Sequence, residues 1–518
     1  MSKPPRISWL DTAISFVAPR YAVTRVRARL ALDQVRAYDG ASAGRRAGGW
    51  RAVGTSADAE TASAGGALRD RMREQVRNNP HAAKALATLT NNIVGNGIEG
   101  RIKTGSESRD ARLNALWKRW CETCDADGQL DFNGLQTLVV RGMLEGGEML
   151  VRREWRRVTD RLPGNMVIRA LEGDHIDSSK DGPLTTGHTL IQGVEFDKIG
   201  RRVAYHLFPH HPGARTTVGR YSLTSVRVNA DAIIHVYEKQ RTQVRGVPWG
   251  TSALTSMRDL RDYEDAELLR KKIEACMVGI VTGGDESDMF IGTEEKASPG
   301  IYDGSGLPVE RFEPGMFLHA RGGKNVTFNT PQAVPGYEAY KRSMLHTIAA
   351  GWRIPYELLT GDLSQVNYSS IRAGLTEFRR LVEAVQYQLV IAMFLRRVGA
   401  WFVEAHLLSG DMTDADAAAI TWEWTPPKWY SVDPLKDVMA DLLELRAGLA
   451  TLPQKIAERG YDSDALLAEI AATNDTLDRL GLILDSDPRA TAKNGSLQVN
   501  LNVGADGAAS NGSAQNGA

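Results

Sequence analysis

The stretch TGDLSQVNYSSIRAGLTEFRRLVEAVQYQLVIA, residues 360–392, joins a polar segment directly to a strongly periodic one. In the periodic part, apolar residues recur at alternating intervals of four and three, at Ile371, Leu375, Phe378, Val382, Val385, Leu389 and Ala392. This spacing places them on one stripe of a helix, which faces a core. The pattern therefore predicts one long helix from Ser370 to about Leu408.

The polar part, Thr360 to Gly374, lies between two helical patterns. Small hydroxyl and amide side chains fill it, and its only charged residues are Asp362 and Arg372. We therefore expect a nearly neutral loop between two helices. An ordinary interhelical connection also satisfies this composition, so the segment alone assigns no function.

The composition of the chain is that of a folded protein without a strong charge bias. Its 518 residues suffice for three or four structural units of ~100–200 residues each. Hydrophobic residues make up 42% and charged residues 24%, which is ordinary for a globular protein. Basic and acidic residues number 63 each, so the net charge is zero. This balance argues against a tight, static nucleic-acid binder, because such proteins neutralise phosphates with a basic excess.

The cysteine content and the hydropathy pattern indicate a cytoplasmic protein. Three cysteines occur, Cys121, Cys124 and Cys276, too few for a disulfide framework. No apolar run approaches the ~18 residues that span a bilayer, so we expect no membrane association. We expect no signal peptide either, because Asp11 interrupts the only weak apolar stretch near the N-terminus.

The N-terminal region is basic. Residues 1–51 contain ten basic and three acidic residues, which fits either a solvated arm or an arm that binds nucleic acid or an acidic partner. The stretch 52–67, rich in Gly, Ala and Ser, predicts a flexible linker. At the other end, the tail 486–518 is rich in Gly, Ala, Asn and Ser, and we expect it to be disordered.

Between these ends, helical and strand-like patterns alternate. The expected order is a helix at 68–94 broken at Pro80, a helix at 111–121, a helix and strand at 131–153, strands over 165–237, a helix at 251–277, β-like runs over 278–335, a helix at 337–353 and helices over 434–484.

Motifs for catalysis or metal binding are weak. GNGIEG (95–100) has a helix before it, the reverse of a dinucleotide site, and so predicts a helix stop with glycines. Cys121-x-x-Cys124 lacks further ligands nearby. The carboxylates of 259–267 alternate with arginines, as on a solvated or intersubunit face. We therefore predict no catalytic residue, metal site or cofactor. A metal-dependent nuclease using the carboxylates of 259–267 is the alternative.

Four stretches in a fixed order carry a resemblance to a known family. They are VRNNPHAAKALATLTNNIVGNGI (76–98), QVRGVPWGTSALTSMRDLRDYEDAELLRKK (243–272), RIPYELLTGDLSQVNYSSIRAGLTEFRR (353–380) and WEWTPPKWYSVDPLKD (422–437). With them the chain resembles the lambda-like portal proteins of tailed phages, the head–tail connector family.

The resemblance implies a structural protein rather than an enzyme. It implies a ring, usually of twelve copies, at one vertex of the capsid, which conducts double-stranded DNA during packaging and ejection. The implied partners are the terminase large subunit, the major capsid protein and the head–tail connector proteins. The implied location is the virion, and the host cytoplasm during assembly. A capsid-associated adaptor without a channel is a further alternative.

The resemblance also implies an α+β portal fold with named parts. These are an arm and linker at 1–67, a mixed α/β wing at 68–250, a first stem helix at 251–276, a small β-containing clip at 277–335, a second stem helix at 336–355, a tunnel loop at 356–371, a long helix with the rest of the wing at 372–433, an α-helical crown at 434–485 and the tail at 486–518.

Two sets of residues would carry the function in this reading. The tunnel loop would contact DNA through Ser364, Gln365, Asn367, Tyr368, Ser369 and Ser370. The first stem helix would pair with neighbouring copies through Arg258, Arg261, Asp262, Asp265 and Arg270. A neutral loop suits moving DNA, since each phosphate neutralised by Lys or Arg adds affinity, whereas hydroxyls and amides bond phosphate oxygens without reading sequence.

Overall fold

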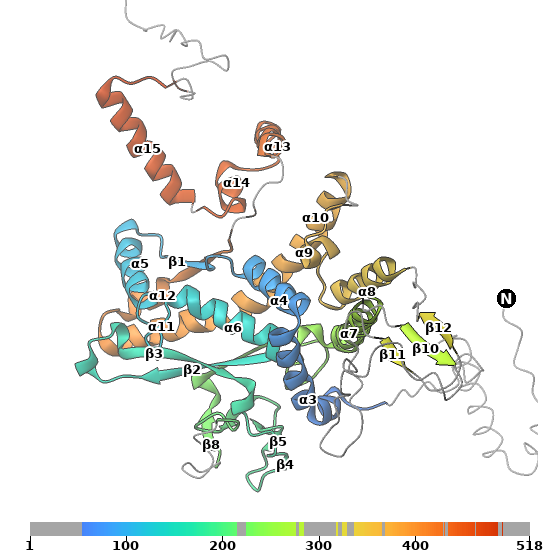
Figure 1. The fold of residues 1–518 in the computed structure, drawn as a ribbon. Coiled ribbons are helices and arrows are strands. Elements are labelled where there is room, and N and C mark those ends of the chain that lie inside the picture. Colours follow the sequence, from blue (N-terminus) through green and yellow to red (C-terminus); the bar gives the residue numbers. More distant parts are fainter. Residues whose placement is uncertain are drawn as a thin grey trace, which may run out of the picture. The chain divides into compact units, whose positions relative to one another are not determined.

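The computed structural model describes residues 54–214, 224–275, 279–283, 317–319, 324–328, 336–364, 368–427, 429, 434–461, 463–484 and 489. Helices and small sheets are mixed along the chain (Figure 1), which confirms the α+β class. The chain divides into two compact units, Met1–Ala59 and Glu60–Ala518, and the structure below is that of the second. The predicted arm (1–51) and, apart from Arg489, the predicted tail lie outside the described residues.

The first two helices are α3 (Ala57–Asn78) and α4 (Pro80–Ile93), and they break at Pro80 as the sequence predicts. Asn79 caps α4, because its side-chain oxygen accepts the amide of His81 at 3.0 Å. Proline suits the next position, since its missing N–H has no partner in the first turn of a helix.

The predicted flexible linker is wrong over much of its length. α3 begins at Ala57, so most of 52–67 is helical. Alanine is the strongest helix former, and it outweighs Gly65 and Gly66, the two glycines in the helical part of this stretch. Side chains also hold the helix in place: Gln192 donates to the Thr61 hydroxyl at 3.1 Å, and Arg241 pairs with Glu60 at 2.8 Å.

A three-stranded antiparallel sheet has the order β3-β2-β9. Its strands are β2 (Glu148–Trp155), β3 (Met166–Glu172) and β9 (Ile233–Tyr237). The helix α6 (Phe132–Gly146) leads into β2 through Gly147, whose φ of 88° lies in the left-handed region that glycine tolerates. This confirms the helix-to-strand passage predicted near residues 131–153.

A second antiparallel sheet has five strands in sequence order. They are β4 (Gly182–Pro183), β5 (Thr189–Ile191), β6 (Val194–Phe196), β7 (Arg202–Leu207) and β8 (Val226–Asn229). Short 3₁₀ turns occur at Val158–Asp160, Pro163–Asn165, Gly173–His175, Ala230–Ala232 and Trp249–Ala253. The strands predicted within 165–237 are thus present, although they belong to two sheets.

The long helix consists of α10 (Tyr368–Val385), a π-helical segment (Gln386–Leu395) and α11 (Arg396–Ser409). Phe378, Val382, Val385 and Leu389 are buried, which confirms the stripe. The π-helical segment was not expected from the periodicity. This segment begins at Gln386, which is buried. The side-chain amide of Gln386 donates to the Ile93 carbonyl at 2.8 Å, at the end of α4.

Aromatic residues from distant parts of the sequence form the core. β1 (Glu99–Lys103) pairs with β13 (Thr421–Thr425) in antiparallel register, and α5 (Glu107–Cys121) and α12 (Asp414–Ala419) lie close by in Figure 1. Trp422 and Trp424 stack at 5.2 Å, and Trp117 contacts Phe402 edge-on at 5.0 Å. Such pairs add specific geometry to the burial of apolar area.

Two further helices, α7 (Leu254–Ala275) and α8 (Tyr337–Gly351), occupy the predicted stem positions. Between them in sequence, β10 (Gly279–Gly283), β11 (Phe317–His319) and β12 (Lys324–Phe328) form one sheet of order β11-β10-β12. The three β-like runs of this region therefore form strands. After α9 (Tyr356–Thr360), the C-terminal helices are α13 (Pro434–Arg446), α14 (Leu452–Glu458) and α15 (Ser463–Leu480). Among the described residues, no helix has the length and apolar character of a membrane span.

A buried carboxylate joins four parts of this fold. The Glu148 side chain, 1% exposed at the start of β2, receives hydrogen bonds from Arg69 of α3 at 3.1 Å and from His235 of β9 at 2.9 Å. Arg245 donates to it from Nε at 2.9 Å and from Nη2 at 2.5 Å. The amide of Gly246 donates at 2.9 Å. Although burial opposes ionisation, the Arg245 guanidinium holds the pKa of Glu148 well below its usual range.

The segment that follows Arg245 runs too close to its neighbours for side chains. A Cβ on Gly246 would lie 2.1 Å from the Gly147 carbonyl oxygen, and one on Gly250 would lie 2.5 Å from the Trp352 ring. Glycine is therefore required at both positions of the GVPWG sequence that precedes α7.

We predict that Glu148→Ala strongly destabilises the chain. Removing the carboxylate leaves Arg245 and Arg69 without their buried partner, and breaking such a cluster typically costs about 3–5 kcal/mol. Urea unfolding followed by circular dichroism measures this loss. Asp262→Ala, which removes an exposed pair, serves as the control and should cost less than about 1 kcal/mol. Equal effects of the two substitutions would contradict the role of Glu148.

We also predict acid lability from the same cluster. Burial lowers the pKa of His235 to about 4, whereas an unfolded histidine titrates near pH ~6.5. Between these values the unfolded chain binds more protons, so the free energy of unfolding falls as the pH drops below about 6.5. The contribution of Glu148 is lost at lower pH still, as the pH falls below its unfolded pKa of about 4.3.

Urea unfolding at several pH values tests this dependence. His235→Gln should flatten the profile between about pH 6.5 and 4. An unaltered slope in the His235 variant would count against the prediction.

Candidate functional site

The polar loop of the opening stretch is shorter than the sequence predicts. α9 ends at Thr360 and α10 begins at Tyr368, so Tyr368, Ser369 and Ser370 belong to the first turn of a helix and not to a loop. Hydroxyl residues suit a helix N-terminus, where the amides lack partners. Gln365 and Asn367 lie outside the described residues, as do the side chains of 368–370. Ser364 is described and exposed.

One carboxylate organises the start of this loop. Asp362 accepts the Tyr356 hydroxyl at 3.2 Å and the Ser364 amide at 3.0 Å, and the Arg342 guanidinium of α8 lies at 3.6 Å. The Ser364 hydroxyl, with help from that amide, lowers the pKa of Asp362. The ionised Asp362 is therefore paired with Arg342. The start of the loop, at Asp362, adds no unpaired negative charge to a segment of hydroxyls and amides.

The corner before the loop is held by Arg353. Its backbone has a φ of 59°, which is uncommon for a residue other than glycine. Its guanidinium pairs with Glu238 at 2.7 Å, just after β9, and lies 4.6 Å from the centre of the Trp249 ring. The turn between α8 and α9 is thereby joined both to the sheet and to the segment that leads into α7.

The exposed part of α7 carries three of the predicted stem residues. Arg258 lies 3.7 Å from Asp262, with both side chains largely exposed. Asp265 is exposed as well. A pair this open to solvent contributes little within one chain, so these groups remain available to a neighbour.

The other two predicted stem residues have partners in their own chain. Arg261 lies 3.4 Å from Glu74 of α3, and Arg270 lies 2.6 Å from Glu267. The contact with Glu74 could not be read from sequence spacing, because 187 positions separate the two residues. Whether either arginine also pairs with a neighbouring copy stays a prediction.

The helices α7 and α8, which the resemblance predicts to be the stem, pack on each other through aromatic rings. Tyr263 contacts Tyr340 at 4.6 Å and stacks on Tyr337 at 6.0 Å, and Lys341 pairs with Glu264 at 2.6 Å. Beyond this contact, Leu268 and Leu269 of α7 are exposed. The buried side chains of α7 itself lie near its start, at Leu254, Met257 and Leu260.

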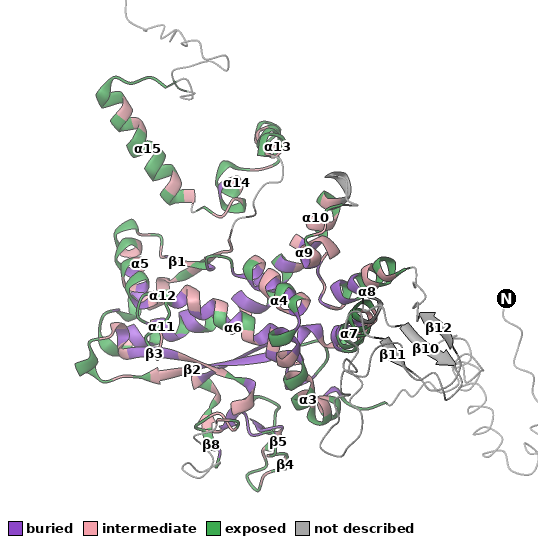
Figure 2. Ribbon diagram, in the orientation of Figure 1, coloured by how far each residue is buried: buried purple, intermediate pink, exposed green. Residues whose placement is uncertain are grey.

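The C-terminal helices have almost no core of their own. Among the described residues of α13, α14 and α15, Ile456 alone is buried, and Figure 2 shows these helices mostly in the colour of exposed residues. On α13 the exposed apolar residues are Leu435, Val438, Met439 and Leu443. Intervals of three and four place such residues on one side of a helix. The sequence alone shows this periodicity, and it predicts an apolar stripe on α13 that the sequence analysis did not include.

The motifs considered weak have structural roles. Gly95 and Gly97 have φ values of 53° and 117° after α4, as expected of a helix stop. Burial, aided by the neighbouring Cys124, raises the pKa of the Cys121 thiol, and burial raises that of Cys124; inert thiols are the expected result.

One group of side chains in the described part of the chain has the spacing of a metal site. The ligand atoms of Glu172, Asp174 and His211 lie within 4.8 Å of one another. Arg73 already pairs with both carboxylates, at 2.7 and 2.6 Å. The Arg73 guanidinium supplies the positive charge that would otherwise come from a metal ion. The group is therefore an ion-pair network.

Sequence comparison matches residues 43–386 to the family described as phage portal protein, lambda family. The chain is 26% identical over 445 residues to the probable portal protein of Halomonas phage phiHAP-1, covering 80% of this chain and 81% of that protein. It is 24% identical over 470 residues to the portal protein of Escherichia phage N15, covering 81% and 86%. It is 23% identical over 447 residues to portal protein B of Escherichia phage lambda, covering 77% and 81%.

Two solved structures are also similar. One is a chain from the neck of an empty gene transfer agent particle, with 15% identity and a TM-score of 0.41, covering 80% of this chain and 97% of that chain. The other is a chain from the virion of a native gene transfer agent particle, with 14% identity, a TM-score of 0.43 and the same coverage.

Proposed function

We propose that this chain, which belongs to the lambda family of phage portal proteins, forms a closed ring that conducts double-stranded DNA into and out of the capsid. Its membership of this family makes it a structural portal protein of the virion rather than an enzyme. The nuclease alternative is therefore set aside. Consistently, two acids of α7 pair with bases, Glu264 with Lys341 and Glu267 with Arg270.

The main support for a ring is that the C-terminal helices have almost no core of their own. Exposed fractions of 77% for Leu435 and 60% for Leu443 leave an apolar stripe on α13 in contact with water. Soluble monomers rarely expose a continuous apolar patch of this kind. Further copies of the same segment would cover it, and identical head-to-tail contacts close into a ring when the rotation between copies permits.

The neutral loop supports the role as a DNA conduit. In a ring, the 361–367 segments of all copies would surround the channel, with their one carboxylate paired to Arg342. Hydroxyl groups offer weak, exchangeable hydrogen bonds to phosphates without the counterion release that would hold the DNA in place.

The remaining parts of the proposal concern partners. The β10–β12 sheet lies in sequence between the two stem helices, the position of the clip in the family, and we assign to it the docking of the terminase large subunit. At the portal vertex, the ring would also contact the major capsid protein and the head–tail connector proteins. Stem residues Arg258, Asp262 and Asp265 would pair with a neighbouring copy.

We predict that the purified protein forms rings with a central hole in negative-stain images. The triple change Leu435→Ser, Val438→Ser and Met439→Ser should leave mostly single chains, because it removes the stripe that neighbours would cover. Ile199→Ser is the matched control, since Ile199 is 80% exposed but lies outside these helices. Solid particles without a hole, or no rings at all, would favour an adaptor instead.

We also predict that a positive charge in the loop slows DNA. Ser364→Lys adds one base per copy to the loop root, and the ring multiplies it around the channel. Rings should form as in wild type, while DNA retention rises and weakens again with added salt. Packaged DNA length at two salt concentrations measures this effect, with Ser364→Ala as the control. Wild-type packaging by the Lys variant at low salt would show that this loop does not face DNA.

A further inference from the structure

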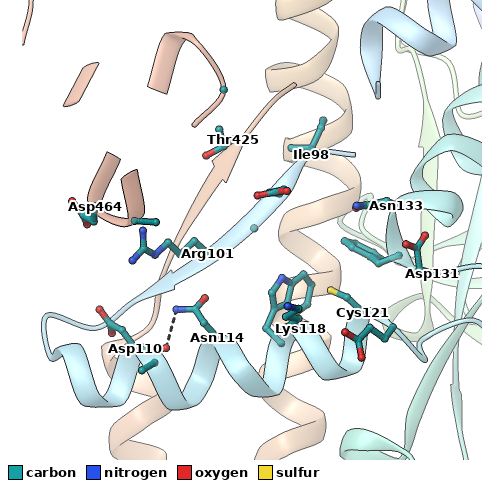
Figure 3. Close-up of a pocket in the computed structure, with 18 of the residues that line it drawn as sticks. Ile98, Arg101, Asp110, Asn114, Lys118, Cys121, Asp131, Asn133, Thr425 and Asp464 are labelled. Atoms are coloured by element: carbon teal, nitrogen blue, oxygen red, sulfur yellow. Dashed lines mark hydrogen bonds between the residues drawn. The ribbon is translucent and has the colours of Figure 1, made fainter. Parts of the chain in front are cut away.

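A groove of about 1100 Å³ lies between α5, β1 and the region of α14 and α15 (Figure 3). The aromatic rings of Trp117 and Phe132 line it, and both are almost fully buried. Figure 3 shows Asp110 and Lys118 on α5 and Asp131 and Asp464 from other elements around the same space. The groove therefore combines an aromatic floor with charged walls.

The charge of the groove is strongly negative. Its lining contains two bases, Arg101 and Lys118, and six acids, which are Glu99, Glu107, Asp110, Glu122, Asp131 and Asp464. Among the described residues, only Asp464 of these six acids has a lysine or arginine within ion-pair distance, Lys103 at 3.3 Å. An excess of carboxylates around one groove attracts positive charge, so the groove favours a cationic occupant.

A surface of opposite character lies at the tip of the β2–β3 hairpin, in the sequence WRRVTDR (155–161). Trp155 is 48% exposed and Val158 is 78% exposed. Arg161 has a φ of 53°, a left-handed conformation that costs energy for a residue with a side chain. A glycine would avoid that cost, so the guanidinium at this position is accompanied by backbone strain.

Two arginines of the tip are free to bind outside their own chain. Arg153 pairs with Glu404, and Arg156 donates to the Ala126 carbonyl at 3.1 Å. Arg157 and Arg161 are exposed, and within the described part of the chain neither guanidinium pairs with a carboxylate. The hairpin tip thus presents the two unpaired guanidinium groups and one exposed carboxylate, Asp160, beside two exposed apolar side chains.

The chemistry of the tip favours a protein partner over DNA. Two free charges would make a weak, salt-sensitive contact with phosphates, and neither Trp155 nor Val158 would gain from it. Exposed tryptophan and arginine are the residue types that dominate protein–protein hot spots. An acidic groove meets both requirements, since it accepts guanidinium groups and would shield Trp155 and Val158 from water where it encloses the tip.

We propose that the hairpin tip of one copy, residues 155–161, docks into the acidic groove of the adjacent copy. The inference rests on the proposed ring, because a contact between two different surfaces of identical chains is the type that generates rings. Complementary charges would steer the copies into register, while Trp155 and Val158 lose their contact with water.

Charge reversal on each side tests the contact. The tip variant carries Arg157→Glu and Arg161→Glu, and the groove variant carries Glu107→Lys and Glu122→Lys, all four at exposed positions. Each variant alone should show at least a tenfold lower fraction of protein in rings, measured by analytical ultracentrifugation and imaging at a concentration where wild type is assembled.

An equimolar mixture of the two variants provides the decisive measurement. In alternating order, an acidic tip meets a basic groove and a basic tip meets an acidic groove, so rings should return to the wild-type fraction. Rescue in the mixture also shows that both variants fold. Ile199→Ser, at an exposed position outside the tip and the groove, serves as the control and should not reduce assembly.

Three outcomes would overturn the contact. The first is normal ring formation by either reversed variant alone, and the second is no rescue in the mixture. The third is wild-type rings in the tip variant together with lost binding of a short DNA duplex, which would make the tip a DNA-binding surface. If wild-type protein itself forms no rings, the proposed function fails instead, and the two failures are thereby distinguished.

Discussion

The structure depends on the buried carboxylate of Glu148 more than on any other polar group. Burying a charge is costly unless it is fully paired, and here Arg69, His235, Arg245 and the Gly246 amide all donate to one side chain. These donors come from α3, from β9 and from the segment that enters α7. The cluster is satisfied in a single arrangement of these parts, so it selects the direction in which α7 leaves the sheet.

The loop between α9 and α10 is connected to the same arrangement. β9, which carries His235, continues to Glu238, and Glu238 holds Arg353 at the corner before α9. Arg353 also lies over Trp249, next to the close contact of Gly250 with Trp352. A segment that is itself polar and short is thus supported at its root by packed, rigid elements. This is what a loop needs if it is to hold a fixed position without a core of its own.

Periodic features were predictable from the sequence, and contacts between distant residues were not. The stripe from Phe378 to Leu389 follows from its spacing alone, and the ordered stretches carried the family resemblance. The Glu148 cluster joins residues as far apart as 69 and 245, and no local pattern connects them. The prediction for 52–67 was wrong because composition does not show tertiary contacts. The glycines of this stretch suggested a linker, whereas its alanines and its contacts with Gln192 and Arg241 stabilise a helix.

The net charge of zero conceals a separation of charge that matters more than the sum. Basic and acidic residues are equal in number, but the groove beside α5 is acidic and the hairpin tip at 155–161 is basic. A chain that associates with copies of itself through two different surfaces must carry both members of each complementary pair, because every copy presents both. Such a chain has no need of a net charge, and opposite patches cancel in the sum. Neutrality is therefore consistent with the proposed ring, in which the loop would leave DNA free to move.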